Sequence, residues 1–107
     1  MCRVKGISML PTLKHGDLVI YKAININYIN DCLEKGSIVI SKHPLKANYL
    51  IVKRLERKEK DKYFIIGDNK DFSKDSRHFG FIQKQNLVGI AESFLSLPIL
   101  NKSSDGK

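Results

Sequence analysis

The stretch YLIVKRLERKEKDKYFIIG, residues 49–67, decides the fold that the sequence predicts. Residues 49–58 and 62–67 both carry the β-branched and aromatic side chains that strands favour. Lys60 and Asp61 lie between the two runs, in a charged connection typical of a solvated turn. Two such runs joined by a short polar connection predict a β-hairpin, so the expectation for the chain starts from β-structure.

Lys53 is the unusual residue of this hairpin. Side chains alternate between the two faces of a strand, so Lys53 shares a face with Ile51 and Leu55. An ammonium group on an apolar face loses hydration, which lowers the lysine pKa and allows the neutral amine to act as a general base. The alternative is an edge-strand lysine that discourages aggregation. Lys53 is therefore a candidate base that requires a nucleophile elsewhere.

Working outward from the hairpin, the remaining chain also predicts mainly strands. Further strands are expected at residues 17–22, 36–42 and 87–93. Between the first two, an extended piece is expected to lead into a short turn or helical segment around residues 31–34, which ends at Gly36. The fold class is thus all-β, a compact sheet or partly closed barrel of short strands. A chain of 107 residues supports one core, expected over residues 1–93, with a partly disordered tail at 94–107.

A candidate nucleophile precedes the first of these strands. Ser8 lies in the stretch GISMLPTL, residues 6–13, in a predicted loop. A serine hydroxyl is a weak nucleophile at neutral pH, so it needs a base and a donor for the developing oxyanion. The alternative is that Ser8 caps the single turn that Pro11 and Thr12 could begin. Ser8 with Lys53 as its base is the catalytic hypothesis.

A third stretch, GDNKDFSKDSRHFG at residues 67–80, is dense in turn-forming residues and in opposite charges. Asp68, Asn69, Asp75 and Arg77 suit a loop held by hydrogen bonds from side chains to backbone and by an Asp/Arg pair. We therefore predict a supporting role for these four residues.

The stretches occur in a fixed order that resembles the signal peptidase I family of serine/lysine endopeptidases. They are GISMLPTL at 6–13 with HGD at 15–17, VKR at 52–54, GDNKDFSKDSRHFG at 67–80 and LVG at 87–89. Single short motifs recur by chance, but this set in one chain is specific and covers most of it. The resemblance implies the β-rich catalytic core of that family and a protease that needs no cofactor.

The resemblance also implies roles for individual residues. Ser8 matches the nucleophile and Lys53 the general base of the family's dyad. Ser73 matches the serine that hydrogen-bonds the catalytic lysine, while Asp75 and Arg77 match the pair that braces the site. Such a supporting set would hold the lysine amine in line with the nucleophile.

Around the nucleophile, one position departs from many family members. They place a hydroxyl residue two positions before the nucleophile to bind the oxyanion, whereas this chain has Gly6. The backbone N–H of Ser8 is then expected to do more of that work, as in other branches that share GxSM. Met9 and Pro11, which flank the motif's centre, are the candidate substrate-binding residues.

Composition narrows the other functional classes. The net charge of +8 favours anionic partners, but the charge is spread along the chain and no aromatic-rich recognition motif accompanies it, so no nucleic-acid partner is expected. Cys2 and Cys32 stand far apart without ligand spacing, and the sequence favours two free thiols without deciding whether they pair. His15, His43 and His78 are isolated, so we expect surface histidines and no metal site.

Other catalytic arrangements have less support. The GxSxG nucleophile elbow fails because Leu10 occupies the second glycine position. A Ser/His/Asp triad that uses Ser8 has no motif in its favour. An inactive relative that only binds peptide is disfavoured because Ser8 and Lys53 are both present.

The substrate expectation rests on the resemblance and on hydropathy. No stretch reaches the roughly 20 apolar residues that a bilayer requires, whereas typical signal peptidases carry an anchor before the serine motif. The expected location is cytoplasmic, with peripheral attachment to a membrane through basic residues as the alternative. The chain resembles short proteases that remove the N-terminal propeptide of a nickel-type superoxide dismutase precursor. The second candidate substrate is the signal peptide of exported proteins, and the oligomeric state is undetermined.

Overall fold

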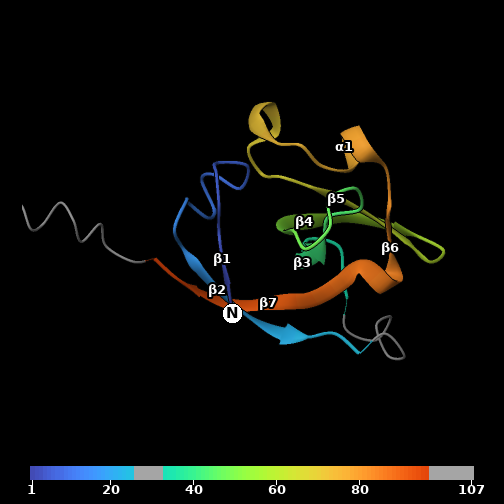
Figure 1. The fold of residues 1–107 in the computed structure, drawn as a ribbon, viewed down its shortest axis with the longest axis horizontal. Coiled ribbons are helices and arrows are strands. Elements are labelled where there is room, and N and C mark those ends of the chain that lie inside the picture. Colours follow the sequence, from blue (N-terminus) through green and yellow to red (C-terminus); the bar gives the residue numbers. More distant parts are fainter. Residues whose placement is uncertain (26–32, 97–107) are drawn as a thin grey trace, which may run out of the picture.

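The computed structural model describes residues 1–25 and 33–96, and this part of the chain forms one antiparallel β-sheet (Figure 1). Its strands are β1 (Cys2–Arg3), β2 (Leu18–Ala23), β3 (Ile38–Lys42), β4 (Leu50–Glu59), β5 (Lys62–Ile66), β6 (Ile82–Gln83) and β7 (Leu87–Leu95). The helical elements are α1 (Ser76–Phe79) and the 3₁₀ turns η2 (Lys70–Phe72) and η3 (Lys84–Asn86). The all-β prediction is confirmed.

The seven strands are ordered β1-β2-β7-β3-β4-β5-β6. Strand β7 pairs with both β2 and β3, so the last strand of the described residues lies between two early ones. Figure 1 shows β7 running alongside β2. The sheet is open, because β1 and β6 end the order without pairing to each other within the described residues. Of the two expected forms, a compact sheet and a partly closed barrel, the described residues adopt the sheet.

The predicted hairpin is confirmed as β4 and β5, with Lys60 and Asp61 at its tip. Lys60 has a φ of 55°, which the tight turn requires. Other predicted strands are confirmed with ends that differ by one or two residues. Strand β3 begins after Gly36, whose φ of 95° keeps it in the preceding turn, and β7 continues past Ser93.

Some predictions concern residues outside the described ranges. Residues 26–32 contain Cys32 and the start of the expected turn around 31–34, and residues 97–107 contain most of the expected tail. The division of the chain at residue 93 stays a prediction. Among the described residues, no helix has the length and apolar character needed to cross a bilayer.

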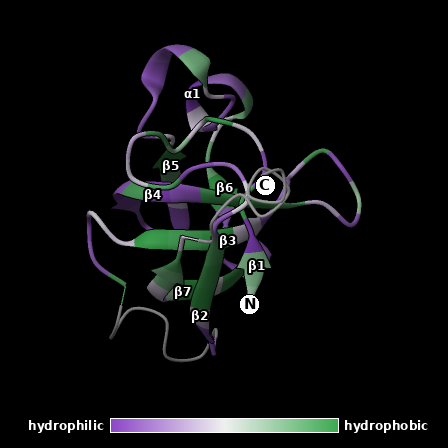
Figure 2. Cartoon of the chain, turned by 90° about the vertical axis from the view of Figure 1, so that its left-hand side faces the viewer, coloured by the Kyte–Doolittle hydropathy of each residue, from purple (hydrophilic) through white to green (hydrophobic). Residues whose placement is uncertain are grey.

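Two apolar clusters cover opposite faces of the central strands. The first contains Val39, Ile51, Leu55, Tyr63, Ile65, Ile82 and Leu87, and the second contains Val4, Met9, Leu13, Val19, Ile40 and Val52. Adjacent residues of β3 and β4 thus enter different clusters, as side-chain alternation requires. Figure 2 shows the apolar colouring along β2 and β3. Residues 51–53 of β4 are buried on both faces of the strand, and Lys53 is buried on the face of Ile51 and Leu55, as predicted.

Candidate active site

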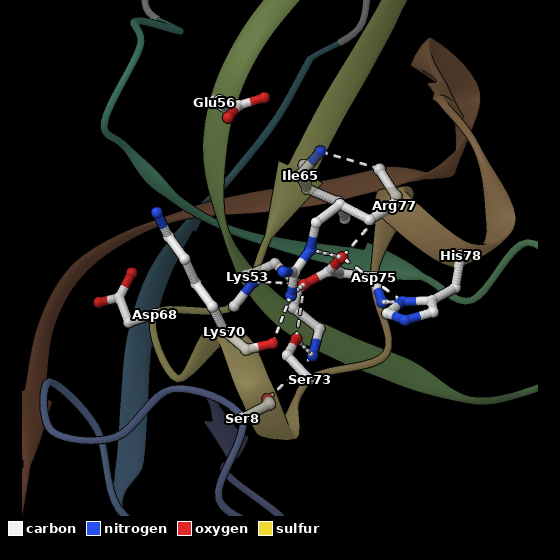
Figure 3. A network of polar contacts seen from close by, with 12 residues as sticks. Ser8, Lys53, Glu56, Ile65, Asp68, Lys70, Ser73, Asp75, Arg77 and His78 are labelled. Atoms are coloured by element: carbon white, nitrogen blue, oxygen red, sulfur yellow. Dashed lines mark hydrogen bonds and ion pairs between the residues drawn. The ribbon is translucent and has the colours of Figure 1, made fainter.

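Three segments distant in sequence meet beside the centre of β4. They are the N-terminal loop at residues 4–13, the strand itself, and the loop at residues 67–79 (Figure 3). The Lys53 Nζ lies 2.8 Å from the Ser8 Oγ, although the two residues are 45 positions apart. The same Nζ lies 3.2 Å from the Ser73 Oγ. The sequence-predicted nucleophile, base and supporting serine are therefore brought together.

The surroundings of Lys53 favour its neutral form. The residue is only 5% exposed, and its burial lowers the pKa of the amine below the usual lysine range. The negative charge of Asp75 acts in the opposite direction, and the positive charge of Arg77 lowers the pKa further. At 2.8 Å, a neutral amine is within hydrogen-bond reach to accept the proton of the Ser8 hydroxyl.

Asp75 is the centre of the supporting network and is fully buried. Its carboxylate accepts hydrogen bonds from the Gly67 N–H at 2.8 Å, from the Ser73 hydroxyl at 2.7 Å and from the Arg77 Nε at 2.9 Å. Burial alone would raise the pKa of this carboxyl, but the hydrogen bonds from Arg77, Gly67 and Ser73 outweigh it and hold the pKa well below its usual range. Asp75 therefore stays charged.

Ser73 connects the carboxylate to the amine. Its hydroxyl proton is directed to Asp75 at 2.7 Å, so an oxygen lone pair is left for the Lys53 Nζ at 3.2 Å. This arrangement orients the lysine amine without placing the carboxylate in direct contact with it. The predicted supporting geometry of Ser73 is present in the structure.

Local helix formation fixes the position of Asp75. Asp75 is the N-cap of α1, where its side chain accepts from the Arg77 N–H at 3.1 Å and its own N–H donates to the His78 Nδ1 at 3.3 Å. The Ser76 hydroxyl accepts from the Ile65 N–H at 2.9 Å, which attaches this turn to β5. The sequence DSRH therefore places Asp75 against the sheet.

Asn69 holds the nucleophile loop directly. Its backbone N–H donates to the Ser8 carbonyl oxygen at 2.8 Å, and its Nδ2 donates to the Ile7 carbonyl oxygen at 3.0 Å. Gly67 allows the two loops to approach this closely. A Cβ at Gly67 would lie 2.6 Å from the Ser8 carbonyl oxygen and 2.2 Å from the Ser73 Oγ, so a larger residue does not fit. The role of Gly67 was not predicted. The glycine that begins the stretch at residues 67–80 is the feature of the sequence that could have indicated this close approach.

Asp68 makes the second connection between the loops. Its carboxylate accepts from the Arg54 Nε at 2.8 Å and Nη2 at 2.6 Å, and from the Thr12 hydroxyl at 2.5 Å. These hydrogen bonds, with Arg54 the strongest influence, lower the pKa of Asp68. Arg54 and Thr12 were not among the predicted supporting residues, because their partner lies 14 and 56 positions away.

The two candidate substrate-binding residues lie in different environments. Met9 is fully buried in the second apolar cluster, and its Sδ accepts from the Asp68 N–H at 3.4 Å. Pro11 is exposed. A part for Met9 and Pro11 in substrate binding stays a prediction.

A cleft of about 560 Å³ opens beside Ser8 and Lys53. Residues 1–9 form one part of its lining and residues 48–53 another. His43 also lines the cleft. It was expected on the surface but is partly buried, because its ring packs against two aromatic rings. The centroid of the His43 ring lies 5.7 Å from that of Tyr49 and 5.1 Å from that of Phe79. The cleft gives a ligand access to a serine hydroxyl that is hydrogen-bonded to a lysine amine.

Sequence comparisons relate this chain to signal peptidases. The family model described as "Signal peptidase, peptidase S26" matches residues 57–95, which include Ser73 and Asp75. A signal peptidase I of Buchnera aphidicola (subsp. Acyrthosiphon pisum) is 36% identical over 83 residues, covering 70% of this chain and 26% of the relative. Signal peptidase IB of Staphylococcus aureus is 29% identical, covering 80% of this chain and 72% of the relative.

Another relative matches a shorter stretch of this chain at a higher sequence identity. Signal peptidase I V of Bacillus subtilis is 58% identical over 31 residues, which are 29% of this chain and 18% of the relative. This chain therefore spans about a quarter or less of the length of the Buchnera and Bacillus relatives, at 26% and 18%.

Proposed function

We propose that this chain, which the family match and the named relatives support as a peptidase of the signal peptidase S26 family, is an endopeptidase with a Ser8/Lys53 dyad. Membership of that family implies a serine endopeptidase. The observation that carries the dyad is the 2.8 Å contact between the Ser8 Oγ and a buried Lys53 Nζ. No other pairing is needed to give the serine a base.

In the proposed mechanism, neutral Lys53 takes the hydroxyl proton of Ser8 while the Ser8 Oγ attacks the carbonyl carbon of the scissile peptide bond. The carbon–nitrogen bond then breaks, and the Lys53 ammonium returns the proton to the leaving amine. A water molecule next attacks the acyl-enzyme and gives its proton to Lys53. The bond between the acyl carbon and the Ser8 Oγ breaks, and the serine recovers its proton.

Ser73 and Asp75 act in this scheme by positioning. Ser73 keeps a lone pair toward the Lys53 Nζ because its own proton is held by Asp75. Gly6 offers no hydroxyl to the oxyanion, so we assign that task to the backbone N–H of Ser8. Backbone donors of this kind are effective when the surrounding loop is rigid, and the two Asn69 hydrogen bonds to the loop supply that rigidity.

Two classes of precursor compete as the substrate. The names of the relatives, signal peptidase I and IB, favour a signal peptide of an exported protein. The N-terminal propeptide of a nickel-type superoxide dismutase precursor, placed first by the motif resemblance, is therefore the second candidate. Both would present an extended peptide to the cleft, which strand-like backbone pairing can bind.

The deciding experiment incubates the purified protein with each precursor and determines the new N-terminus by mass spectrometry. A single defined cut that is absent with Ser8→Ala supports the dyad and identifies the precursor class. If neither precursor, nor any peptide of a diverse library, is cut by folded protein, the proposed function is wrong.

Location is a separate proposal. We keep cytoplasmic as the first location and peripheral membrane attachment as the second. Fractionation of cells in low and high salt separates them, since attachment through exposed cations is screened by salt. Recovery in the membrane pellet at high salt would contradict both.

A further inference from the structure

The cleft beside Ser8 is lined by several positively charged side chains. Arg3, Lys5, Lys46 and Lys74 all contribute to it and are all exposed. No aspartate or glutamate is among its lining residues in the described part of the chain. The positive charge is spread along the sequence, so the fold is what collects these four side chains around the nucleophile.

These cations are available to a ligand. None of the four forms an ion pair with a carboxylate of the described residues. The Arg3 Nη1 donates to a backbone carbonyl at 3.1 Å, and the Lys46 ammonium lies 5.1 Å from the ring centroid of Tyr49. Neither contact neutralises charge. The exposed carboxylate of Asp71 does not line this cleft; it lines a neighbouring hollow with Arg77, and Lys74 borders both.

A group inside the cleft responds to this positive charge. The pKa of His43 is lowered first by burial and then by the charges of Lys46 and Lys53. The imidazole is thus held toward its neutral form, and the positive potential of the cleft is carried by the lysines and Arg3. A bound carboxylate would be attracted by several cations at once.

Apolar side chains share the cleft with the cations. Ile7, Tyr49, Leu50 and Phe72 line it and are between 41% and 65% exposed. Extended peptides bind such surfaces through alternate side chains, with backbone hydrogen bonds along their length. A cleft with apolar contacts and a cationic lining is complementary to a peptide that carries both apolar and acidic residues.

We propose that the peptide cut at Ser8 carries acidic residues within a few positions of its scissile bond, recognised by Arg3, Lys5, Lys46 and Lys74. This inference rests on the proposed function and adds a substrate class to it. The occupant is an extended peptide and not a lipid surface, because the cations line the concavity that contains the nucleophile.

The test uses matched peptides around one cleavable sequence. A single Asp is moved through the four positions on each side of the scissile bond, and each peptide has an Asn counterpart. We expect at least one Asp peptide to have a kcat/KM about fivefold or more above its Asn counterpart at low salt. The ratio should fall toward one as ionic strength rises, since the attraction is between exposed charges.

Charge reversal identifies the residues. Lys46→Glu and Lys74→Glu should each lower the Asp/Asn ratio by about threefold to tenfold, and the double variant should lower it further. Lys22→Glu is the matched control, since Lys22 is exposed on β2 and is not a lining residue of the cleft. It changes net charge equally and should leave the ratio unchanged.

Binding separates this inference from the proposed function. Fluorescence anisotropy with folded Ser8→Ala compares the affinity of labelled Asp and Asn peptides without turnover. Cleavage with equal kcat/KM for all pairs overturns the acidic preference while the peptidase function stands. If no precursor or library peptide is cut, the proposed function is wrong, and tighter binding of the Asp peptides would then still support an acidic peptide ligand for the cleft.

Vesicles test the competing use of the cations. If phosphatidylglycerol vesicles bind the wild type, and both reversals abolish that binding while Asp and Asn peptides remain equivalent, the cations serve a lipid surface and the peptide inference is wrong. Vesicle binding that competes with the Asp peptides, or no vesicle binding, supports it.

Discussion

The network at Asp75 and the tip of the β4–β5 hairpin join arginines to carboxylates at nearly equal distances. The Arg77 Nε lies 2.9 Å from Asp75, and the Arg57 Nε lies 3.0 Å from Glu59. Asp75 is 0% exposed, whereas the Arg57 and Glu59 side chains are 46% and 52% exposed. Water competes for the hairpin pair, while Asp75 depends on its protein donors. Burial and the number of donors, not the distance, therefore separate the buried Asp75 network from a surface pair.

The largest effect is expected at the dyad of the buried network. Ser8→Ala and Lys53→Arg should each lower kcat/KM by a factor of about 1,000 or more, because one lacks the nucleophile and the other holds a guanidinium that stays protonated. Peptide cleavage assays measure this, with Ser93→Ala on the exposed part of β7 as a control. Substantial turnover by either variant, at an unchanged circular dichroism spectrum, would remove the dyad hypothesis.

A variant of Lys53 that loses activity should not lose stability. Lys53→Met is expected to abolish cleavage but leave the melting temperature unchanged or higher. The folded-state pKa of Lys53 lies below its unfolded value, so burial of this amine costs stability at every pH below the unfolded pKa, and methionine removes that cost. Thermal unfolding at pH 7 checks this. A fall of many degrees would mean that the amine holds the fold together.

The lowered pKa of Lys53 also predicts a pH profile. In the proposed mechanism the neutral amine is the active form, so kcat/KM should rise about tenfold per pH unit until it levels off at an apparent pKa below the usual 10.5 of lysine. A kcat/KM profile on an uncharged peptide measures it. A profile that is flat across the neutral range and rises only above pH 10 would show that burial does not tune this lysine.

Gly67→Ala should disturb the network by contact alone. Its Cβ would lie 2.6 Å from the Ser8 carbonyl oxygen, a backbone atom that cannot move without shifting the nucleophile loop. We expect kcat to fall about 100-fold, since a displacement near 1 Å is sufficient for such a loss. Peptide cleavage and thermal unfolding measure the two consequences. Unchanged kcat would mean that the loops approach less closely than 2.6 Å implies.

Asp75→Ala tests how much the buried Asp75 network contributes to stability. It leaves the Gly67 N–H and the Ser73 hydroxyl without their acceptor in a buried site, which should cost about 3 kcal/mol of unfolding free energy and most of the activity. Because the folded pKa of Asp75 is depressed, its contribution is complete above the unfolded carboxyl pKa and is lost as pH falls through the folded value. Urea unfolding at pH 7 measures the cost. Lost activity at unchanged stability would assign Asp75 a direct catalytic role.

The smallest effect is expected at the exposed ion pair of the hairpin. Glu59→Ala should change the unfolding free energy by less than about 0.5 kcal/mol and leave cleavage of uncharged peptides unchanged, because Glu59 is exposed and Arg57 also pairs with Glu56. The same urea experiment measures it. A cost comparable to that of Asp75→Ala would contradict the distinction drawn between the two regions.

Alternation along each strand was readable from the sequence. The hairpin at 49–67, the burial of Lys53 with Ile51 and Leu55, and the all-β class all follow from side chains that alternate within one strand. These properties are local, since they depend on neighbours within a few positions. The strand ends differed by one or two residues, because turn geometry at residues such as Gly36 sets them.

The motif resemblance supplied the candidate site residues but not their contacts. Asp68 and Asn69 were expected to stabilise their own loop, yet Asn69 binds the carbonyl oxygens of Ile7 and Ser8, and Asp68 binds Thr12 and Arg54. Nothing in the local pattern identifies a partner 56 or 62 positions away. Such contacts form only when the sheet brings the two loops together.

The sequence by itself therefore determined which residues could form strands, because alternation acts over a few residues, and its motif resemblance indicated which residues to propose for the chemistry. Tertiary structure alone decided that Ser8 lies 2.8 Å from Lys53, that Gly67 has no room for a Cβ, and that four dispersed cations line one cleft. The physical reason is strand order. Placing β7 between β2 and β3 joins the N-terminal loop and β4 to one sheet, and distances between remote side chains are fixed only then.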